Sequence, residues 1–169
     1  FGIGAYTSAL LATNGVPYVF CFILAGSVAS FFGFLLIFST KKLKGDYYAL
    51  ATLGFAFVVY SLLQNLIGLT KGPLGIAGIP RPSFFGFTVG DNFGYLIFVF
   101  VVACASVFFV NKIVKSRFGK LLEATRDDEI GIRVLGKDAS KLKYKSMAVS
   151  AFIAGIAGSL FAHYISFID

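Results

Sequence analysis

FGYLIFVFVVACASVFFV, residues 93–110, contains no charged side chain and no proline. A helix crosses the roughly 30 Å hydrocarbon layer of a bilayer with about 20 residues, because each residue advances it by about 1.5 Å. We therefore predict a membrane-spanning helix from Phe93 to Val110, with a possible extension to Val114. This segment sets the protein class, and the remainder of the chain repeats its pattern.

The composition of the whole chain supports a membrane protein. Of 169 residues, 57% are hydrophobic and 14% are charged, and the mean hydropathy is +0.84. These charges are too few for the polar shell of a soluble domain. We predict one all-α integral membrane domain over residues 1–169, truncated at both ends, with about five spans. The other four are expected at residues 1–12, which is short, 18–38, 47–69 and 146–168.

The positive charges predict which connections lie in the cytoplasm. Of the 15 Lys and Arg residues, three lie in 41–44, ten in 112–145, and two in 70–92. Cytoplasmic loops are enriched in Lys and Arg. We therefore expect the loop at about 115–145 to be cytoplasmic and the loop at 70–92 to be periplasmic. The net charge of +7 is then explained by topology, and nucleic acid is not an expected partner.

Several kinds of chemistry are not expected from this sequence. Cys21 and Cys104 lie inside hydrophobic runs, and we expect both to be buried as small residues. Their positions lack the spacing of a metal site. Acidic residues gather in one cytoplasmic segment with no His or Cys beside them, so no catalytic site is predicted. The predicted spans hold no acidic or basic residue well inside them, which argues against a proton-coupled transporter.

The cytoplasmic loop contains a pattern typical of a short capped helix. Asp127, Asp128 and Glu129 would fill a first turn, where negative charge meets the positive end of the helix dipole. Thr125 or Asp127 would cap that helix, and Gly136 would end it. Such a helix is either a solvated linker or a rigid docking element for a soluble partner.

Two further helix caps follow from the same reasoning. Asp46 is expected to cap the helix that begins near Tyr47. Asp138 or Ser140 is expected to cap the helix that enters the membrane after Lys145.

Motifs spread along the chain resemble one family. The segment RDDEI at 126–130 is similar to the cytoplasmic loop of branched-chain amino-acid ABC importer permeases of the Liv type. Further matches, in the family's order, are FGIGAYT at 1–7, GDYYALATLGF at 45–55, TKGPLGIAGIP at 70–80, Leu135-Gly136, Lys143, SAFIAGIAG at 150–158 and AHY at 162–164. The loop pattern is closer to LivM-like than to LivH-like permeases.

The resemblance implies a transport subunit of the bacterial inner membrane rather than an enzyme. Its expected partners are a second permease subunit, cytoplasmic ATPase subunits and a periplasmic substrate-binding protein, together with the lipid membrane. No cofactor is expected on the chain itself, because ATP would bind to the ATPase. The residues implied in coupling to the ATPase are Glu123, Arg126, Asp127, Asp128, Glu129, Ile130 and Gly136. Gly131-Ile132 departs from the small alanines that often follow in the family.

Three other residue sets are predicted sites. Gln64 and Asn65 would line the passage or form packing hydrogen bonds. The external loop would contact the binding protein or pack as a plug, through Gly72, Pro73, Gly75, Gly78 and Pro80. Small residues at helical spacing would pack one helix on another, or form a subunit contact or a moving translocation interface, through Ala151, Gly155, Gly158 and Ala162. His163 is expected to be buried at an interface or bonded to a backbone group.

Other readings remain open at this point. A urea or short-chain amide permease of the same superfamily would share these motifs. An ATP-independent secondary transporter or channel would leave the coupling segment unexplained, and a membrane enzyme would need converging acid, base or metal groups.

Overall fold

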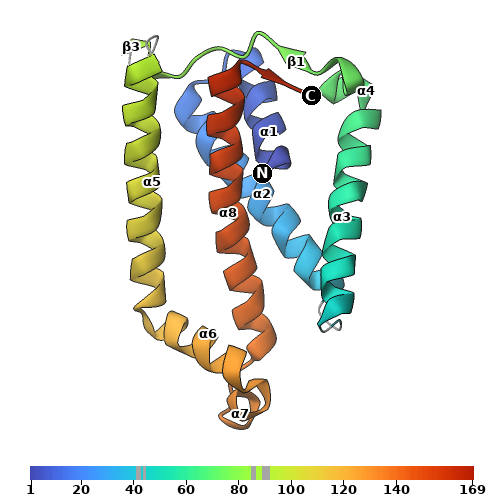
Figure 1. Cartoon of the computed structure of the whole chain (residues 1–169), viewed down its shortest axis with the longest axis vertical. Coiled ribbons are helices and arrows are strands. Elements are labelled where there is room, and N and C mark those ends of the chain that lie inside the picture. The colour runs from blue at the N-terminus through green and yellow to red at the C-terminus, as the bar shows by residue number, and fades with distance from the viewer. Residues whose placement is uncertain (41–42, 44, 85–86, 89–91) are drawn as a thin grey trace.

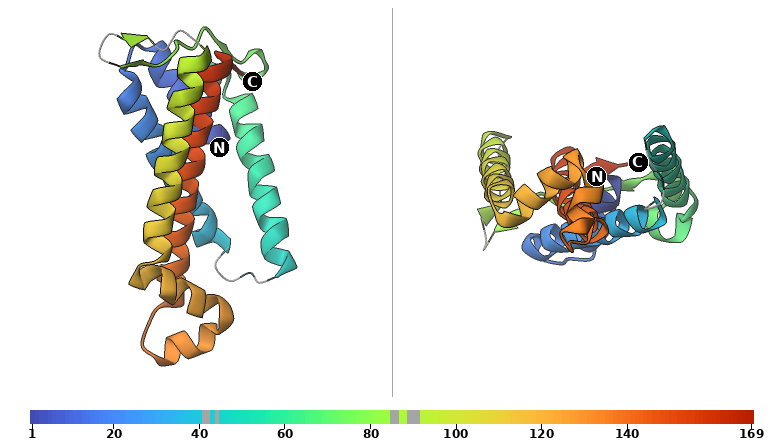
Figure 2. Two further views of the ribbon diagram at one scale, coloured as in Figure 1. Left: turned by 60° about the vertical axis from the view of Figure 1, so that its left-hand side comes forward. Right: turned by 90° about the horizontal axis from the view of Figure 1, so that it is seen from below.

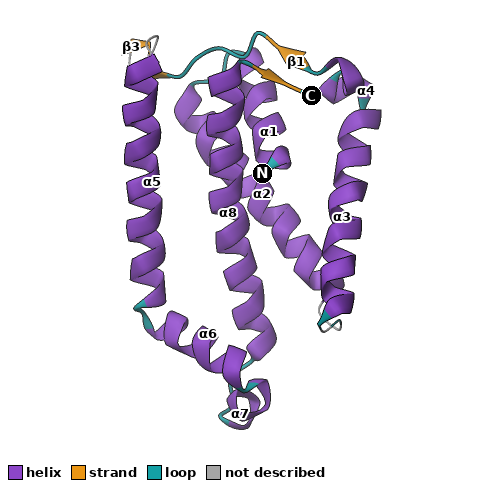
Figure 3. Ribbon diagram, in the orientation of Figure 1, coloured by secondary structure: helices purple, strands orange, loops and turns teal. Residues whose placement is uncertain are grey.

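The computed structural model describes residues 1–40, 43, 45–84, 87–88 and 92–169. Four of its helices are long and apolar enough to cross a membrane: α2 (Tyr18–Thr40), α3 (Asp46–Asn65), α5 (Asn92–Val114) and α8 (Ala139–Ile165). In Figure 1 α3, α5 and α8 stand roughly upright and α2 crosses α8 obliquely, and helices dominate the chain in Figure 3. The predicted all-α membrane fold is confirmed. The predicted basic cluster of Lys41, Lys42 and Lys44 lies outside the described residues.

The connections alternate between the two ends of the bundle, as predicted. The 12-residue helix α1 (Gly2–Thr13) turns into α2 at the upper end in Figure 1, which is also where α3 leads to α5. The long connection from α5 to α8 lies at the lower end. Of the five predicted spans, the structure thus has four of full length, with α1 as the short fifth segment.

Small residues bring α1, α2 and α8 together into the core of the bundle. A Cβ atom added at Gly4 of α1 would meet the backbone of Gly155 on α8. A Cβ at Gly155 would lie 2.5 Å from Ala29 Cβ and 2.8 Å from the carbonyl oxygen of Ala25, both on α2. Since lipid supplies no hydrophobic drive between helices, such close backbone approach is the main source of packing energy.

The helices α3 and α5 stand apart from this core, on opposite sides of it (Figures 1 and 2). No described residue of α3 is buried, and Tyr95 is the buried residue of α5. The Tyr95 hydroxyl donates a 2.6 Å hydrogen bond to the carbonyl of Leu160 on α8. The expectation that both cysteines are buried is wrong for Cys104, which is exposed because α5 packs on little else; Cys21 is buried.

The third helix ends earlier than predicted. The helix α3 stops at Asn65 instead of continuing to Leu69, and the short helix α4 (Ile67–Thr70) follows it. The Thr70 hydroxyl donates to the carbonyls of Leu63, at 2.5 Å, and Leu66, at 3.0 Å, and so satisfies groups that a helix end leaves free. Asp46 is not the predicted cap: Gly45 holds that position, with a positive φ of 56°, and no side chain caps α3.

Short elements cover the upper end of the bundle. After α4 come the 3₁₀ helix η1 (Gly72–Leu74) and strand β1 (Ile76–Ala77), which pairs antiparallel with β4 (Phe167–Ile168) at the far end of the chain. Strands β2 (Ser83–Phe84) and β3 (Phe87–Thr88) form a second pair. Ile76 and Ile79 are buried against α1, α2 and α8. This part of the loop predicted to be external is therefore packed onto the bundle.

Candidate functional site

A helix that the sequence analysis missed begins the lower connection. Helix α6 (Arg117–Asp127) starts at Ser116, whose hydroxyl accepts a hydrogen bond from the Gly119 amide at 3.4 Å. It carries apolar residues at the helical spacing i, i+3 and i+4, namely Phe118, Leu121 and Leu122. This spacing and the serine cap were the available signals. The two views of Figures 1 and 2 show α6 passing beneath the bundle from the base of α5 towards the base of α8.

The predicted coupling helix is shorter than expected and has a different cap. Helix α7 (Glu129–Val134) begins at Asp128, whose carboxylate accepts from the amides of Ile130, at 2.9 Å, and Gly131, at 3.0 Å. The prediction of Thr125 or Asp127 as cap is wrong, because both belong to α6; the Thr125 hydroxyl donates to the Leu121 carbonyl. Gly136, with φ of 71°, lies just beyond the end of α7.

Glu129 ties α7 to α8. One carboxylate oxygen accepts from Lys143 Nζ at 2.6 Å, and the other accepts from Arg133 Nη2 at 2.7 Å. The hydrogen bond from Lys143 lowers the pKa of Glu129, with smaller contributions from its charge and from Arg133, against an opposing effect of desolvation. Because the folded-state pKa is lowered, this stabilisation is present above the ordinary glutamate value and is lost as the pH falls through the folded value.

We expect Glu129 and Lys143 to be coupled in a double-mutant cycle. Their side chains are 27% and 45% exposed, and exposed ion pairs contribute up to about 1 kcal/mol. Glu129→Gln, Lys143→Met and the double variant should be compared by amide hydrogen exchange over α7. The matched control is Asp138 with Lys141, a looser pair at 3.7 Å with 50% and 76% exposure. Additive effects at Glu129 and Lys143 would show that this contact does not hold α7.

Three apolar side chains of α7 and its end project into solvent. Ile130 is 76% exposed, Val134 81% and Leu135 73%. We call these three residues the α7 surface. Beside it, Arg126 and Asp127 form an exposed ion pair at 3.2 Å. The structure therefore separates the predicted coupling residues: Asp128 and Glu129 hold the segment in shape, while Ile130 lies on its outer surface.

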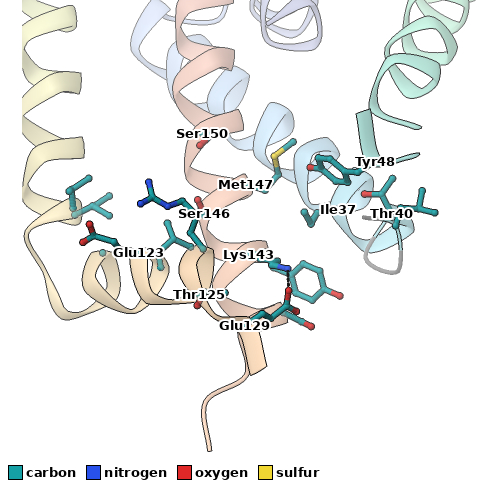
Figure 4. A pocket seen from close by; sticks show the side chains of 18 of the residues that line it. Ile37, Thr40, Tyr48, Glu123, Thr125, Glu129, Lys143, Ser146, Met147 and Ser150 are labelled. Carbon is teal, nitrogen blue, oxygen red and sulfur yellow. Dashed lines mark hydrogen bonds and ion pairs between the residues drawn. The ribbon is translucent and has the colours of Figure 1, made fainter. Parts of the chain in front are cut away.

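A cavity of about 830 Å³ lies above α6, between the lower ends of α2, α3, α5 and α8. Figure 4 shows Glu123, Thr125 and Glu129 on its floor and Ser146, Met147 and Ser150 along α8. The cavity is lined by both polar and apolar groups. Glu123, predicted to contact the ATPase, lines this cavity.

The predicted external contact residues divide into two groups. Gly72 and Gly75 are buried, and their positive φ values of 56° and 65° favour glycine. Pro73, Gly78 and Pro80 are exposed. Leu74, which the sequence analysis did not single out, is 81% exposed at the same end.

The predicted passage residues lie at the end of α3. Gln64 is partly buried and Asn65 is exposed. The Asn65 amide donates to the Ser61 carbonyl at 2.8 Å, and the Gln64 amide donates to the Tyr60 hydroxyl at 3.5 Å. These bonds lie within one helix, and the structure brings neither residue to the cavity.

The four predicted packing residues all lie on α8, and Ala151, Gly155 and Gly158 pack against α2, α1 or Phe1 of the same chain. A Cβ at Gly158 would meet the backbone of Phe1, and a Cβ at Gly33 would lie 2.5 Å from Ala151 Cβ. Ala162 is fully buried. Within the described residues, Gly155 and Gly158 are covered by neighbouring helices and are not open to a second subunit.

Comparison with known proteins places this architecture in a family. A family model described as "Branched-chain amino acid transport system / permease component" matches residues 1–169. The chain belongs to this family. The permease is 38% identical over its whole length to the high-affinity branched-chain amino acid transport system permease protein LivM of Salmonella typhimurium and of Escherichia coli. It is 31% identical, over 92% of its length, to the probable LivM of Methanocaldococcus jannaschii.

The permease chain spans less than half of these curated relatives, 45% of the two bacterial proteins and 46% of the archaeal one. A more distant relative is the autoinducer 2 import system permease protein LsrC of Yersinia pestis, 27% identical over 86% of the chain. No solved structure matches the chain.

Proposed function

We propose that this chain is part of the permease subunit of an ATP-driven importer of leucine, isoleucine and valine in the bacterial inner membrane. The observation that carries the proposal is the α7 surface. It lies at the lower extremity of the molecule, with three apolar side chains in solvent. Single exposed apolar residues are common, but three of them on one short capped helix and its end support an interaction site.

The local structure supports docking of a soluble partner at α7. The Asp128 cap and the contacts of Glu129 with Arg133 and Lys143 hold α7 in one conformation. A preorganised segment loses little entropy on binding. The partner proposed here is the cytoplasmic ATPase, which would bind and hydrolyse ATP. Movement of the ATPase would then reach α8 through the Glu129–Lys143 contact.

Charge distribution supports the orientation of the permease in the membrane. The connection between α5 and α8 is rich in Lys and Arg, whereas the residues between α3 and α5 include Lys71 and Arg81 as their basic residues. We therefore place α6 and α7 in the cytoplasm and α4, η1 and β1 in the periplasm. A periplasmic binding protein would dock on the exposed part of this external region, around Pro73, Gly78 and Pro80.

The substrate is proposed from the relatives whose names specify one. LivM proteins, at 38% identity, are named for branched-chain amino acids, whereas the autoinducer 2 permease stands at 27%. Because both kinds of permease match the same chain, the fold by itself does not select the substrate.

Uptake into proteoliposomes tests the proposal. The full-length permease would be reconstituted with its second permease subunit, its ATPases and its binding protein. We expect radiolabelled leucine to accumulate only with internal ATP, and excess unlabelled valine, but not urea, to compete. Uptake of urea in place of leucine would keep the transporter and replace its substrate. Leucine uptake without ATP would overturn the importer itself.

A further inference from the structure

A buried polar network joins the external region to the core of the bundle. The His163 ring on α8 contacts the Pro80 carbonyl through Nδ1, at 2.7 Å, and the Ser8 hydroxyl on α1 through Nε2, at 2.8 Å. The Ser8 hydroxyl in turn contacts the Ser159 hydroxyl at 2.7 Å. His163 is 1% exposed, and both serines are fully buried. These buried polar atoms therefore satisfy one another's hydrogen bonding.

The chemistry of the groups gives the hydrogen bonds one direction. A proline carbonyl can only accept, so Nδ1 of His163 carries the proton and donates to Pro80. In the neutral ring Nε2 then accepts from the Ser8 hydroxyl, and Ser8 accepts from Ser159. The ring orientation is fixed further by Tyr18, whose ring meets the imidazole edge-on with centroids 4.7 Å apart. The His163 imidazole thus bonds both to Pro80 in the external loop and to Ser8 on the buried face of α1.

Regular secondary structure accounts for only two of residues 76–82, and the contact with His163 adds to it. Strand β1 has only two residues, and the Ile79 amide donates to the Ser166 carbonyl at 3.3 Å. Ile76, Ile79 and Pro82 are buried, while Ala77, Gly78 and Pro80 between them are exposed. The segment thus alternates between anchoring and outward-facing positions, and the His163 bond lies between the last two anchors.

We propose that His163 is a positioning residue: it fixes residues 76–82 on the end of α8 as the preformed surface on which the binding protein docks. The proposal rests on the function proposed above. A loop held in its bound shape loses less conformational entropy on docking than a free one. His163 therefore acts on affinity for the binding protein through Pro80, without touching the transported molecule.

The helix that carries His163 also reaches the opposite face of the molecule. Lys143, which bonds Glu129 of α7, lies 20 residues earlier on the same unbroken helix, or about 30 Å along its axis. The red α8 in Figure 1 runs from the external strands to α6 and α7. Both proposed docking regions are thus bonded to one helix.

Two substitutions at His163 separate the outer bond from the inner one. Asparagine places its amide nitrogen near the position of Nδ1 and keeps a donor for Pro80, whereas glutamine reaches towards the position of Nε2 and Ser8. ATPase activity of the reconstituted full-length transporter would be titrated with its binding protein. We expect His163→Gln to raise the binding-protein concentration for half-maximal stimulation at least fivefold. His163→Asn should remain within twofold of wild type.

Ser8→Ala is the control for a purely structural role. It removes the inner bond and leaves the bond to Pro80, so it should lower Tm without changing the half-maximal concentration. Equal half-maximal values for His163→Gln and His163→Asn would overturn the positioning role. A wild-type transporter that its binding protein does not stimulate would instead overturn the proposed function.

Hydrogen exchange of the wild-type full-length protein gives a test that needs no variant. The Ile79 amide, which donates to the Ser166 carbonyl, should exchange nearly as slowly as the amides at the external end of α8. If His163→Gln folds, exchange over residues 76–82 should accelerate about tenfold in it. Free exchange of the Ile79 amide in wild type would show that the segment is not preformed, and the proposal would fail.

Discussion

Gly155→Leu is expected to prevent assembly of α1, α2 and α8. A single Cβ at position 155 would already lie 2.5 Å from Ala29 Cβ, 2.8 Å from the Ala25 carbonyl oxygen and 3.1 Å from Gly26 Cα. Two of these neighbours are backbone atoms, which cannot move aside as a flexible side chain could. Inserting atoms into a packed core costs about 1–3 kcal/mol for small additions, which is the range expected for Gly155→Ala. Leucine adds three further carbon atoms and should exceed it.

Size-exclusion profiles and thermal unfolding of the detergent-solubilised full-length protein measure this effect. The matched control is Ala157→Leu, which places the same side chain on an exposed position of the same helix. We expect the control to remain monodisperse with a Tm close to wild type, Gly155→Ala to lose several degrees, and Gly155→Leu to aggregate. A monodisperse Gly155→Leu protein of normal Tm would contradict the described packing.

Hydrophobic length and charge were sufficient to predict the membrane helices. Helices α2, α5 and α8 contain most residues of three of the predicted spans. Asp138 caps α8 as expected, and its carboxylate accepts from the amides of Ser140 and Lys141. The errors occurred where a local pattern allows two outcomes. Leu66 to Leu69 is apolar and was assigned to the third helix, but Thr70 folds back onto the carbonyls of Leu63 and Leu66 and ends α3 early.

Contacts between distant segments could not be predicted from the sequence. The spacing of Gly155 and Gly158 indicates a surface for close packing, but it does not name Gly4 and Ala29 as the residues opposite. In the same way, nothing local to His163 points to Pro80, which lies 83 residues away. These pairings depend on the tilt and depth of each helix, which are set by all the packed helices together.

The acidic residues of the predicted cytoplasmic loop show the same limit for the candidate site. Asp128 and Glu129 can cap a helix, pair with a basic side chain, or contact a partner, and their spacing is the same in each case. Which of these roles Glu129 takes depends on the position of Lys143. That position is set by the start of α8 at Ala139. The structure assigns both carboxylates to internal contacts, so charge reversal at these positions would disturb α7 itself as well as any docking.

Ile130→Ser with Val134→Ser is expected to abolish stable binding of the ATPase while leaving α7 folded. Both side chains are largely exposed, at 76% and 81%, so their loss removes no internal packing. If the ATPase buries them, each contributes about 1.5 kcal/mol or more, and the pair about 3 kcal/mol. That energy corresponds to a loss of affinity of at least about a hundredfold.

Affinity of the full-length permease complex for its purified ATPase, measured by biolayer interferometry in nanodiscs, tests this expectation. Lys137→Ser serves as the control, because it changes an exposed side chain just beyond Gly136 without removing apolar surface. Hydrogen exchange over α7 should match wild type in both variants, since the Asp128 cap and the Glu129 contacts with Arg133 and Lys143 are retained. Wild-type affinity in the double variant would place the docking surface elsewhere, whereas faster exchange would mean that Ile130 and Val134 stabilise α7. Loss of affinity with an intact α7 would identify the apolar side chains, rather than the acidic first turn, as the contact with the ATPase.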